Sequence, residues 1–508
     1  MLLTSPRAFV SPASPPAVSF SSSRARQLAA LCAVACALLA PLSGARAATH
    51  ARQQNSAPAV SPSPDLPRGR LVKQVPTVAS AAQTYALYLP SNYTPERRWP
   101  VLYCFDPAAR GHVPVERFRE AAERYGWIVV GSNNSRNGPL QPSLEATKAM
   151  WDDTHARLSI DAGRVYASGF SGGARVAVRL AYLCRNCLAG VVAVGGGFPV
   201  GVEPSREVAF ALFGVAGTDD FNFPEMRRLD DTLARLDFPR RLELFEGGHA
   251  WAPATLMSEA VEWFELQAMR SNRRALDEAL LEELWRKAGA KARASEEAKR
   301  LYEAYRIYQA GASDFRGLRD VSEFERRAKE LRATKEVRRA LDEEGGQVRR
   351  QQQLAQEAVM LARQKTDAEN GAIAFADFRR LVADLRKTSR GAEDTGERRV
   401  ARRVLHQVFA QFYESAANLR ARGVQNSTVA SELELAAEVS PDNPQLHFEL
   451  ACAHARNGDK RKALEALGRA AEKGFKDAAE LARNEALAPL RAEPAFKELL
   501  EKLSGTKP

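Results

Sequence analysis

The chain has 508 residues, of which 45% are hydrophobic and 27% charged, and it carries a formal net charge of +11 with a pI near 9.4. This length suffices for two to four domains of about 100–200 residues each, and six cysteines exclude a small disulfide-built protein. The net charge is +4 in residues 1–47, +1 in 48–270 and +6 in 271–508. Because no basic cluster is interleaved with aromatic residues, the charge does not predict nucleic-acid binding.

Residues 1–47 have the pattern of a secretion signal. Two arginines precede an apolar run over 28–42, and a small-x-small cleavage sequence follows at 45–47. The run is too short to cross a bilayer comfortably, so we expect an exported protein, periplasmic or extracellular, without a membrane span after cleavage. An uncleaved N-terminal anchor is the alternative. Residues 48–69, rich in Pro, Ser and Ala, are predicted to form a flexible linker.

Between residues 70 and 270, short apolar runs alternate with helical patterns. Strands are predicted at 85–89, 101–105, 128–132, 164–168, 191–194, 208–213 and 242–245, and helices at 115–125, 144–158, 174–184, 224–236 and 255–269. This alternation predicts an α/β fold, a doubly wound and mostly parallel sheet with helices on both faces. In such a sheet we expect the working groups at the carboxyl ends of the strands.

The rest of the chain is predicted to be all-α. Residues 254–440 contain no proline in 187 positions and are rich in Ala, Glu, Leu, Arg and Gln. We expect a helical region over 271–400 and tetratricopeptide-like helical repeats over 401–508. Residues 444–475 match that repeat, with large, small and turn residues at Leu450, Ala451, Gly458, Ala463, Leu467 and Ala470. Such repeats predict a surface for protein contacts.

A G-x-S-x-G motif at residues 169–173 joins the predicted strand at 164–168 to the helix at 174–184. A serine on a tight turn between strand and helix is exposed for nucleophilic attack, and the flanking glycines let sheet and helix approach closely. The motif therefore predicts Ser171 as a nucleophile. The alternative is a structural serine in a glycine-rich turn.

A serine nucleophile needs a base and an acid that orients the base. His249 follows the last predicted strand in a Gly-Gly-His-Ala-Trp loop, whereas His155 falls within a predicted helix, so His249 is the predicted base. Asp219 and Asp220 follow the strand at 208–213, between the serine and the histidine. The order Ser, Asp, His and the Gly-x-x-Asp spacing favour Asp220 as the acid, and Asp219 remains the alternative. A further alternative is that both aspartates only stabilise the turn and have no catalytic role.

The order of these residues, and their place in the alternating strands and helices, resemble the α/β-hydrolase superfamily. Residues 70–270 are similar to its secreted esterases of the feruloyl-esterase and polyhydroxybutyrate-depolymerase type, on the segments at 85–107, 217–226 and 242–251. The resemblance implies an oxyanion hole of two backbone N–H groups, one of them from Gly172. The second is expected from the loop after residue 105, where Pro107 has no N–H and Ala108 is the candidate.

The sequence thus predicts an exported serine esterase that forms an acyl-enzyme on a small-molecule or polymer ester. No cofactor, metal or nucleic acid is expected, since no metal-ligand spacing and no phosphate loop occurs. The alternatives are a prolyl-oligopeptidase-like peptidase and a non-catalytic interaction protein on a degenerate hydrolase scaffold. Cys184 and Cys187 are expected to form a disulfide, to be inert thiols or to act in redox chemistry.

Overall fold

The computed structural model describes residues 66–367 and 369–504, which all belong to one compact unit, Ala59–Pro508. The predicted signal and most of the predicted linker lie outside the described residues. At the end of that linker, Gly69 already donates its N–H to the Leu89 carbonyl oxygen (2.8 Å), so the ordered fold begins before residue 70. Among the described residues, no helix has both the length and the apolar character needed to cross a membrane.

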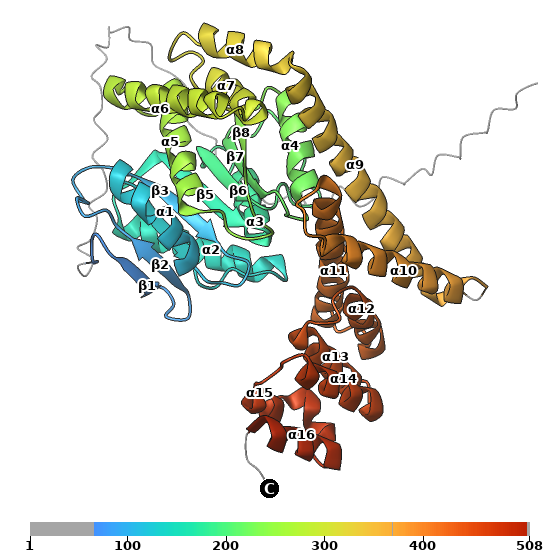
Figure 1. Cartoon of the computed structure of the whole chain (residues 1–508). Coiled ribbons are helices and arrows are strands. Elements are labelled where there is room, and N and C mark those ends of the chain that lie inside the picture. Colours follow the sequence, from blue (N-terminus) through green and yellow to red (C-terminus); the bar gives the residue numbers. More distant parts are fainter. Residues whose placement is uncertain (1–65, 368, 505–508) are drawn as a thin grey trace, which may run out of the picture. The chain divides into compact units, whose positions relative to one another are not determined.

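The chain first builds an eight-stranded sheet with the order β1-β2-β4-β3-β5-β6-β7-β8 (Figure 1). The strands are β1 (Leu71–Pro76), β2 (Thr84–Tyr88), β3 (Trp99–Phe105), β4 (Ile128–Ser132), β5 (Ile160–Phe170), β6 (Gly190–Val194), β7 (Ala211–Gly217) and β8 (Arg240–Phe245). β1 and β2 are antiparallel to their neighbours, and every pair from β4 to β8 is parallel. This order, with β3 and β4 exchanged and an antiparallel β2, is that of the α/β-hydrolase fold, as predicted.

Five helices cover the two faces of the sheet: α1 (His112–Tyr125), α2 (Leu140–Arg157), α3 (Gly172–Leu183), α4 (Phe223–Arg235) and α5 (Ala254–Arg270). Apolar residues of α1 and α5 pack against one face, and those of α2, α3 and α4 against the other. Strand residues alternate between these two cores, so the interior strands are apolar on both sides and read as continuous hydrophobic runs.

β1 was not predicted from the sequence. It is an edge strand with several exposed side chains, and Lys73 and Gln74 interrupt its apolar pattern. β7 also starts later than predicted, because Val208 and Phe210 are buried before the strand begins rather than within it.

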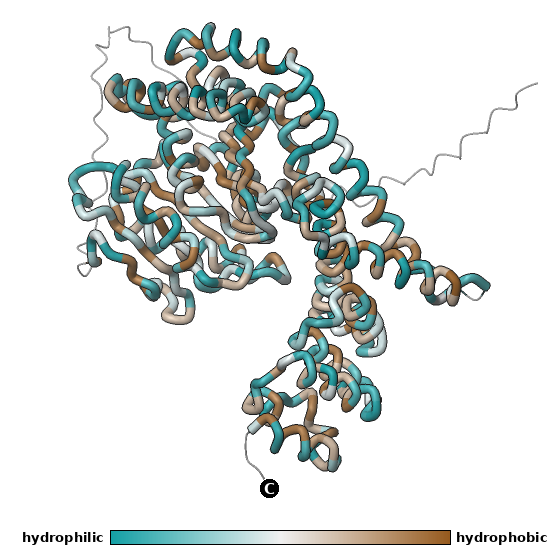
Figure 2. The backbone as a smooth tube through the Cα atoms, in the orientation of Figure 1, coloured by the Kyte–Doolittle hydropathy of each residue, from teal (hydrophilic) through white to brown (hydrophobic). Residues whose placement is uncertain are grey.

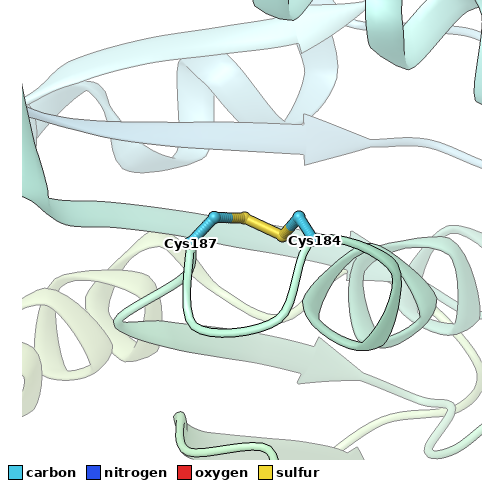
Figure 3. Close-up of a disulfide and its surroundings, with 2 residues drawn as sticks. All are labelled: Cys184 and Cys187. Atoms are coloured by element: carbon cyan, nitrogen blue, oxygen red, sulfur yellow. A yellow bond between two sulfur atoms is a disulfide. The ribbon is translucent and has the colours of Figure 1, made fainter. Parts of the chain in front are cut away.

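A disulfide joins Cys184 and Cys187 just after α3, with their Cα atoms 5.6 Å apart (Figure 3). Of the three alternatives for this pair, the structure contains the disulfide. The cysteines enclose a two-residue turn in which both Arg185 and Asn186 have positive φ values. The bridge therefore closes the turn that leads from α3 to β6.

After α5, all regular elements of the described residues are helical. They are α6 (Glu278–Glu297), α7 (Leu301–Asp314), α8 (Ser322–Arg332), α9 (Lys335–Arg363), η1 (Gln364–Thr366), α10 (Gly371–Ser389), α11 (Gly396–Ala421), α12 (Asn426–Val439), α13 (Pro444–Arg456), α14 (Lys460–Glu472), α15 (Ala478–Arg483), η2 (Glu485–Leu490) and α16 (Pro494–Ser504). Figure 2 shows hydrophobic and hydrophilic segments alternating along these helices, which is typical of helices with one buried face.

α11 begins before the predicted division between residues 400 and 401 and runs through it. Thr395 sets its start, because the hydroxyl of this N-cap accepts the Arg398 N–H. Further on, α13 and α14 pack together around buried Leu450, Ala451 and Ala463, and Gly458 has φ 79° in the turn between them. These helices are consistent with a helical-repeat region, and the tetratricopeptide assignment stays a prediction.

Candidate active site

Ser171 occupies the sharp turn between β5 and α3. Its φ of 54° and ψ of −119° are unusual for a residue with a side chain and are held by the packing around the turn. A Cβ on Gly173 would lie 2.1 Å from the Phe105 carbonyl oxygen, so only glycine lets α3 pack this closely onto β3. The turn presents Ser171 at the carboxyl end of β5, where the motif predicted it.

The structure brings the three predicted residues Ser171, His249 and Asp220 together. His249 Nε2 lies 2.9 Å from Ser171 Oγ, and His249 Nδ1 lies 2.9 Å from Asp220 Oδ1. Asp220 follows β7 and is fully buried, and His249 follows β8. Asp219 turns away from the histidine and forms an ion pair of 2.7 Å with Arg402.

The surroundings of His249 suit a general base. Asp220 Oδ1 also accepts the Asn222 N–H at 2.8 Å, which fixes the carboxylate beside the ring. A carboxylate at Nδ1 favours the tautomer that leaves Nε2 free to take a proton. The rings of Phe170 and Phe221 lie 4.5 and 4.2 Å from the imidazole, centroid to centroid. These apolar walls restrict water around the serine and histidine and strengthen their electrostatic interaction.

The loop after β3 does not offer the predicted second oxyanion donor. The Ala108 N–H donates to Asp106 Oδ1 (2.9 Å), and the Ala109 N–H donates to the Asp106 carbonyl oxygen (3.0 Å). The prediction of Ala108 is therefore corrected, because its only N–H is turned into its own loop. Gly172, the other predicted donor, is the first residue of α3, where backbone N–H groups lack an intrahelical acceptor.

Asp106 is the centre of that loop. Its buried carboxylate also accepts the side-chain N–H groups of Arg110 (2.9 and 3.0 Å) and of Trp251 (2.9 Å). Burial by itself raises the pKa of Asp106, but these hydrogen bonds outweigh it and hold the pKa below its usual value. The aspartate is thus ionised at neutral pH and ties the β3 loop to Trp251, two residues after the candidate base.

Helices from the second half of the chain hold the loop that carries Asp220. Arg403 of α11 is 1% exposed, its Nε lies 2.6 Å from the Thr218 carbonyl oxygen, and its guanidinium lies 4.0 Å from the centre of the Phe223 ring. Gln351 of α9 donates its side-chain N–H to the Phe221 carbonyl oxygen at 2.8 Å. Both sides of Asp220 are therefore fixed by residues far along the chain.

Sequence reasoning missed Arg403 and Gln351. Both lie on charged or polar helices, and Arg403 sits beside the buried stripe of Val400, Val404 and Val408. An arginine next to an apolar stripe is a weak sign of burial, and nothing local indicates a partner 185 residues earlier. Among the described residues, no group of three or more His, Cys, Asp or Glu is arranged to hold a metal ion.

No protein-family model and no curated protein matches the chain. Solved structures do match part of it. A fluorophosphonate-binding serine hydrolase of Staphylococcus aureus with bound substrate is 15% identical, with 39% of this chain and 99% of that chain covered and a TM-score of 0.32. A ferulic acid esterase is 14% identical, with coverage of 38% and 97% and a TM-score of 0.33. The feruloyl esterase module of Clostridium thermocellum in complex with sinapinate is 15% identical, with coverage of 42% and 94% and a TM-score of 0.31.

Proposed function

We propose that the protein is a serine hydrolase that cleaves carboxylic esters through an acyl-enzyme on Ser171. The observation that carries the proposal is the continuous contact from Ser171 Oγ through His249 to the buried Asp220 carboxylate, with the serine on a strained turn. A turn of this kind costs about 1–3 kcal/mol of strain, and such strain concentrates at functional sites. A serine in a purely structural turn needs neither the histidine nor the acid.

The reaction follows from these contacts. Ser171 Oγ attacks the ester carbonyl carbon while His249 Nε2 takes its proton, and the carbonyl electron pair moves onto the oxygen. The Gly172 N–H donates to this oxyanion. When the intermediate collapses, His249 gives the proton to the departing alkoxide, and the alcohol leaves. Water then attacks the acyl-serine with its proton taken by the same imidazole, and the carboxylic acid leaves as Ser171 regains its proton.

Export after signal cleavage and protein contacts through the C-terminal helices are also part of the proposal, and both rest on the sequence patterns. The ester class rests on the segments of residues 70–270 that are similar to secreted esterases. A peptidase of the same chemistry would cleave an amide instead, so the test must offer both bonds.

The test is labelling of the folded full chain with a fluorophosphonate probe, which reacts covalently with an activated serine. We expect the native chain to be labelled and Ser171→Ala to remain unlabelled. p-Nitrophenyl esters of graded acyl length, offered beside a peptide p-nitroanilide, then separate ester from amide cleavage. Failure of the native chain to label would refute the proposal, and faster cleavage of the anilide would replace esterase by peptidase.

A further inference from the structure

We propose that the side-chain amide of Asn137 is the second donor to the oxyanion, beside the Gly172 N–H. This inference rests on the proposed acyl transfer at Ser171 and names a further catalytic residue for it. An oxyanion hole needs two convergent donors, and residues 107–109 of the β3 loop do not supply one, because Pro107 has no N–H and the Ala108 and Ala109 N–H groups are occupied.

The backbone brings Asn137 beside the β3 loop and the Ser171 turn. The Asn137 N–H donates to the Pro107 carbonyl oxygen at 2.8 Å, and Arg136 forms an antiparallel bridge with Ala108. The loop after β4 is thereby joined to the loop after β3, beside the turn that carries Ser171. Residue 137 is fixed through its main chain, so its side chain starts from a defined position.

That side chain lies directly against Gly172. A Cβ built on Gly172 would lie 1.9 Å from Asn137 Oδ1, 2.9 Å from its Cγ and 3.3 Å from its Nδ2. The amide therefore fills the space that a side chain at position 172 would need, next to the residue whose N–H is the first donor. The G-x-S-x-G motif tolerates any residue at this position, and a side chain there would have to displace the Asn137 amide.

The amide is also free to donate. Neither its oxygen nor its nitrogen has a hydrogen-bond partner within residues 66–367 and 369–504, and the side chain is exposed to solvent. Rotation of the amide about its last bond exchanges Oδ1 and Nδ2, so the group can present an N–H wherever its oxygen now lies. A developing negative charge on the substrate oxygen selects the N–H orientation.

The test compares Asn137→Ala with Gln141→Ala in the full chain, using p-nitrophenyl ester hydrolysis. Gln141 is a matched control, because it is an exposed amide of α2 whose side chain, among the described residues, bonds only Glu145. For Asn137→Ala we expect kcat to fall about 10²–10³-fold with KM within about threefold, and Gln141→Ala to match the native chain. The affinity for an alkyl boronic acid, whose tetrahedral adduct places an oxygen in the hole, should fall by a similar factor.

A second variant separates donation from shape. Asn137→Asp keeps the size of the side chain but places a carboxylate beside the oxyanion, so its kcat should lie below that of Asn137→Ala at neutral pH. An unchanged kcat in Asn137→Ala, or a rise in KM alone, would overturn the assignment of Asn137 while leaving Ser171 labelling intact. Loss of labelling in the native chain would instead overturn the proposed function, so the two failures are distinguishable.

Discussion

Replacement of Arg403 by methionine tests whether α11 holds the loop that carries the candidate acid Asp220. The change removes the hydrogen bonds to the Thr218 carbonyl oxygen and the cation over the Phe223 ring, while methionine keeps most of the buried volume. Thr218 lies two residues before Asp220, so its release loosens the residue that orients His249. We therefore expect Arg403→Met to fold and to lose catalytic rate.

For the free energy of unfolding, the interactions that Arg403 makes and the cost of burying its charge nearly cancel. A hydrogen bond from a charged donor contributes about 1.5–3 kcal/mol, and a desolvated cation–π contact about 2 kcal/mol. Against this, burial is the main cause that lowers the pKa of Arg403 to about 10, and this shift corresponds to a net cost of about 3 kcal/mol for holding the cation in its site. The free energy of unfolding should consequently change by less than about 2 kcal/mol in Arg403→Met.

The catalytic rate should not be compensated in this way, because it depends on the position of the Asp220 loop. A displacement of about 1 Å in a positioned group can cost about 10²-fold in rate, so we expect kcat of Arg403→Met to fall about 10–100-fold with a smaller change in KM. The assay is steady-state ester hydrolysis together with urea unfolding. Arg402→Met is the control, because its partly exposed ion pair with Asp219 contributes at most about 1 kcal/mol. A folded Arg403→Met with native kcat would refute the reasoning.

Two further predictions concern single titratable groups. Asp220→Asn should lower kcat by about 10⁴-fold, because an amide at Nδ1 favours the wrong imidazole tautomer, whereas Asp219→Asn next to it should stay within a few-fold of the native chain; equal losses in both variants would contradict the assignment of the acid. The second prediction is that the C-terminal helical region loses stability in acid because of buried His454. Burial lowers its pKa below the usual 6.5, with Glu434 partly opposing, so the unfolded chain takes up the proton first. The contribution of this group to the free energy of unfolding is therefore constant above about pH 6.5 and falls as the pH drops through that value. Urea unfolding of the native chain and of His454→Gln between pH 8 and 5 will measure the difference. An equal decline in both proteins would exclude His454 as the cause.

The contacts of the candidate triad could be predicted from the sequence because each of its three residues lies in a glycine-containing turn or loop directly after a strand. The glycines around Ser171 and the loops that carry Asp220 and His249 follow apolar strands, and parallel strands bring their carboxyl ends to one edge. The second oxyanion donor could not be predicted in this way. The conformation of the β3 loop decides which of its N–H groups bond to Asp106. The hydrogen bond between Asn137 and Pro107 joins two loops that are separated in the sequence by a helix and a strand, so no local pattern indicates it.

The contacts of the Asp220 loop with α9 and α11 could not be predicted for a different reason. Gln351 and Arg403 meet their partners only after α9 and α11 have packed against the sheet, at sequence separations of 130 and 185 residues. The helix patterns predicted that these segments are helical and have one buried face. They contain no information on which loop that face covers.

The anchoring of the Asp220 loop by α9 and α11 also sets an order for biosynthesis. All strands of the sheet and the three residues of the candidate triad leave the ribosome before residue 271, but Gln351 and Arg403 follow 102 and 154 residues after His249. Domains fold as units from the N-terminus during synthesis. The Asp220 loop therefore lacks both of its anchors until α9 and α11 have been synthesised, and the candidate triad is the last part of the sheet region to be completed.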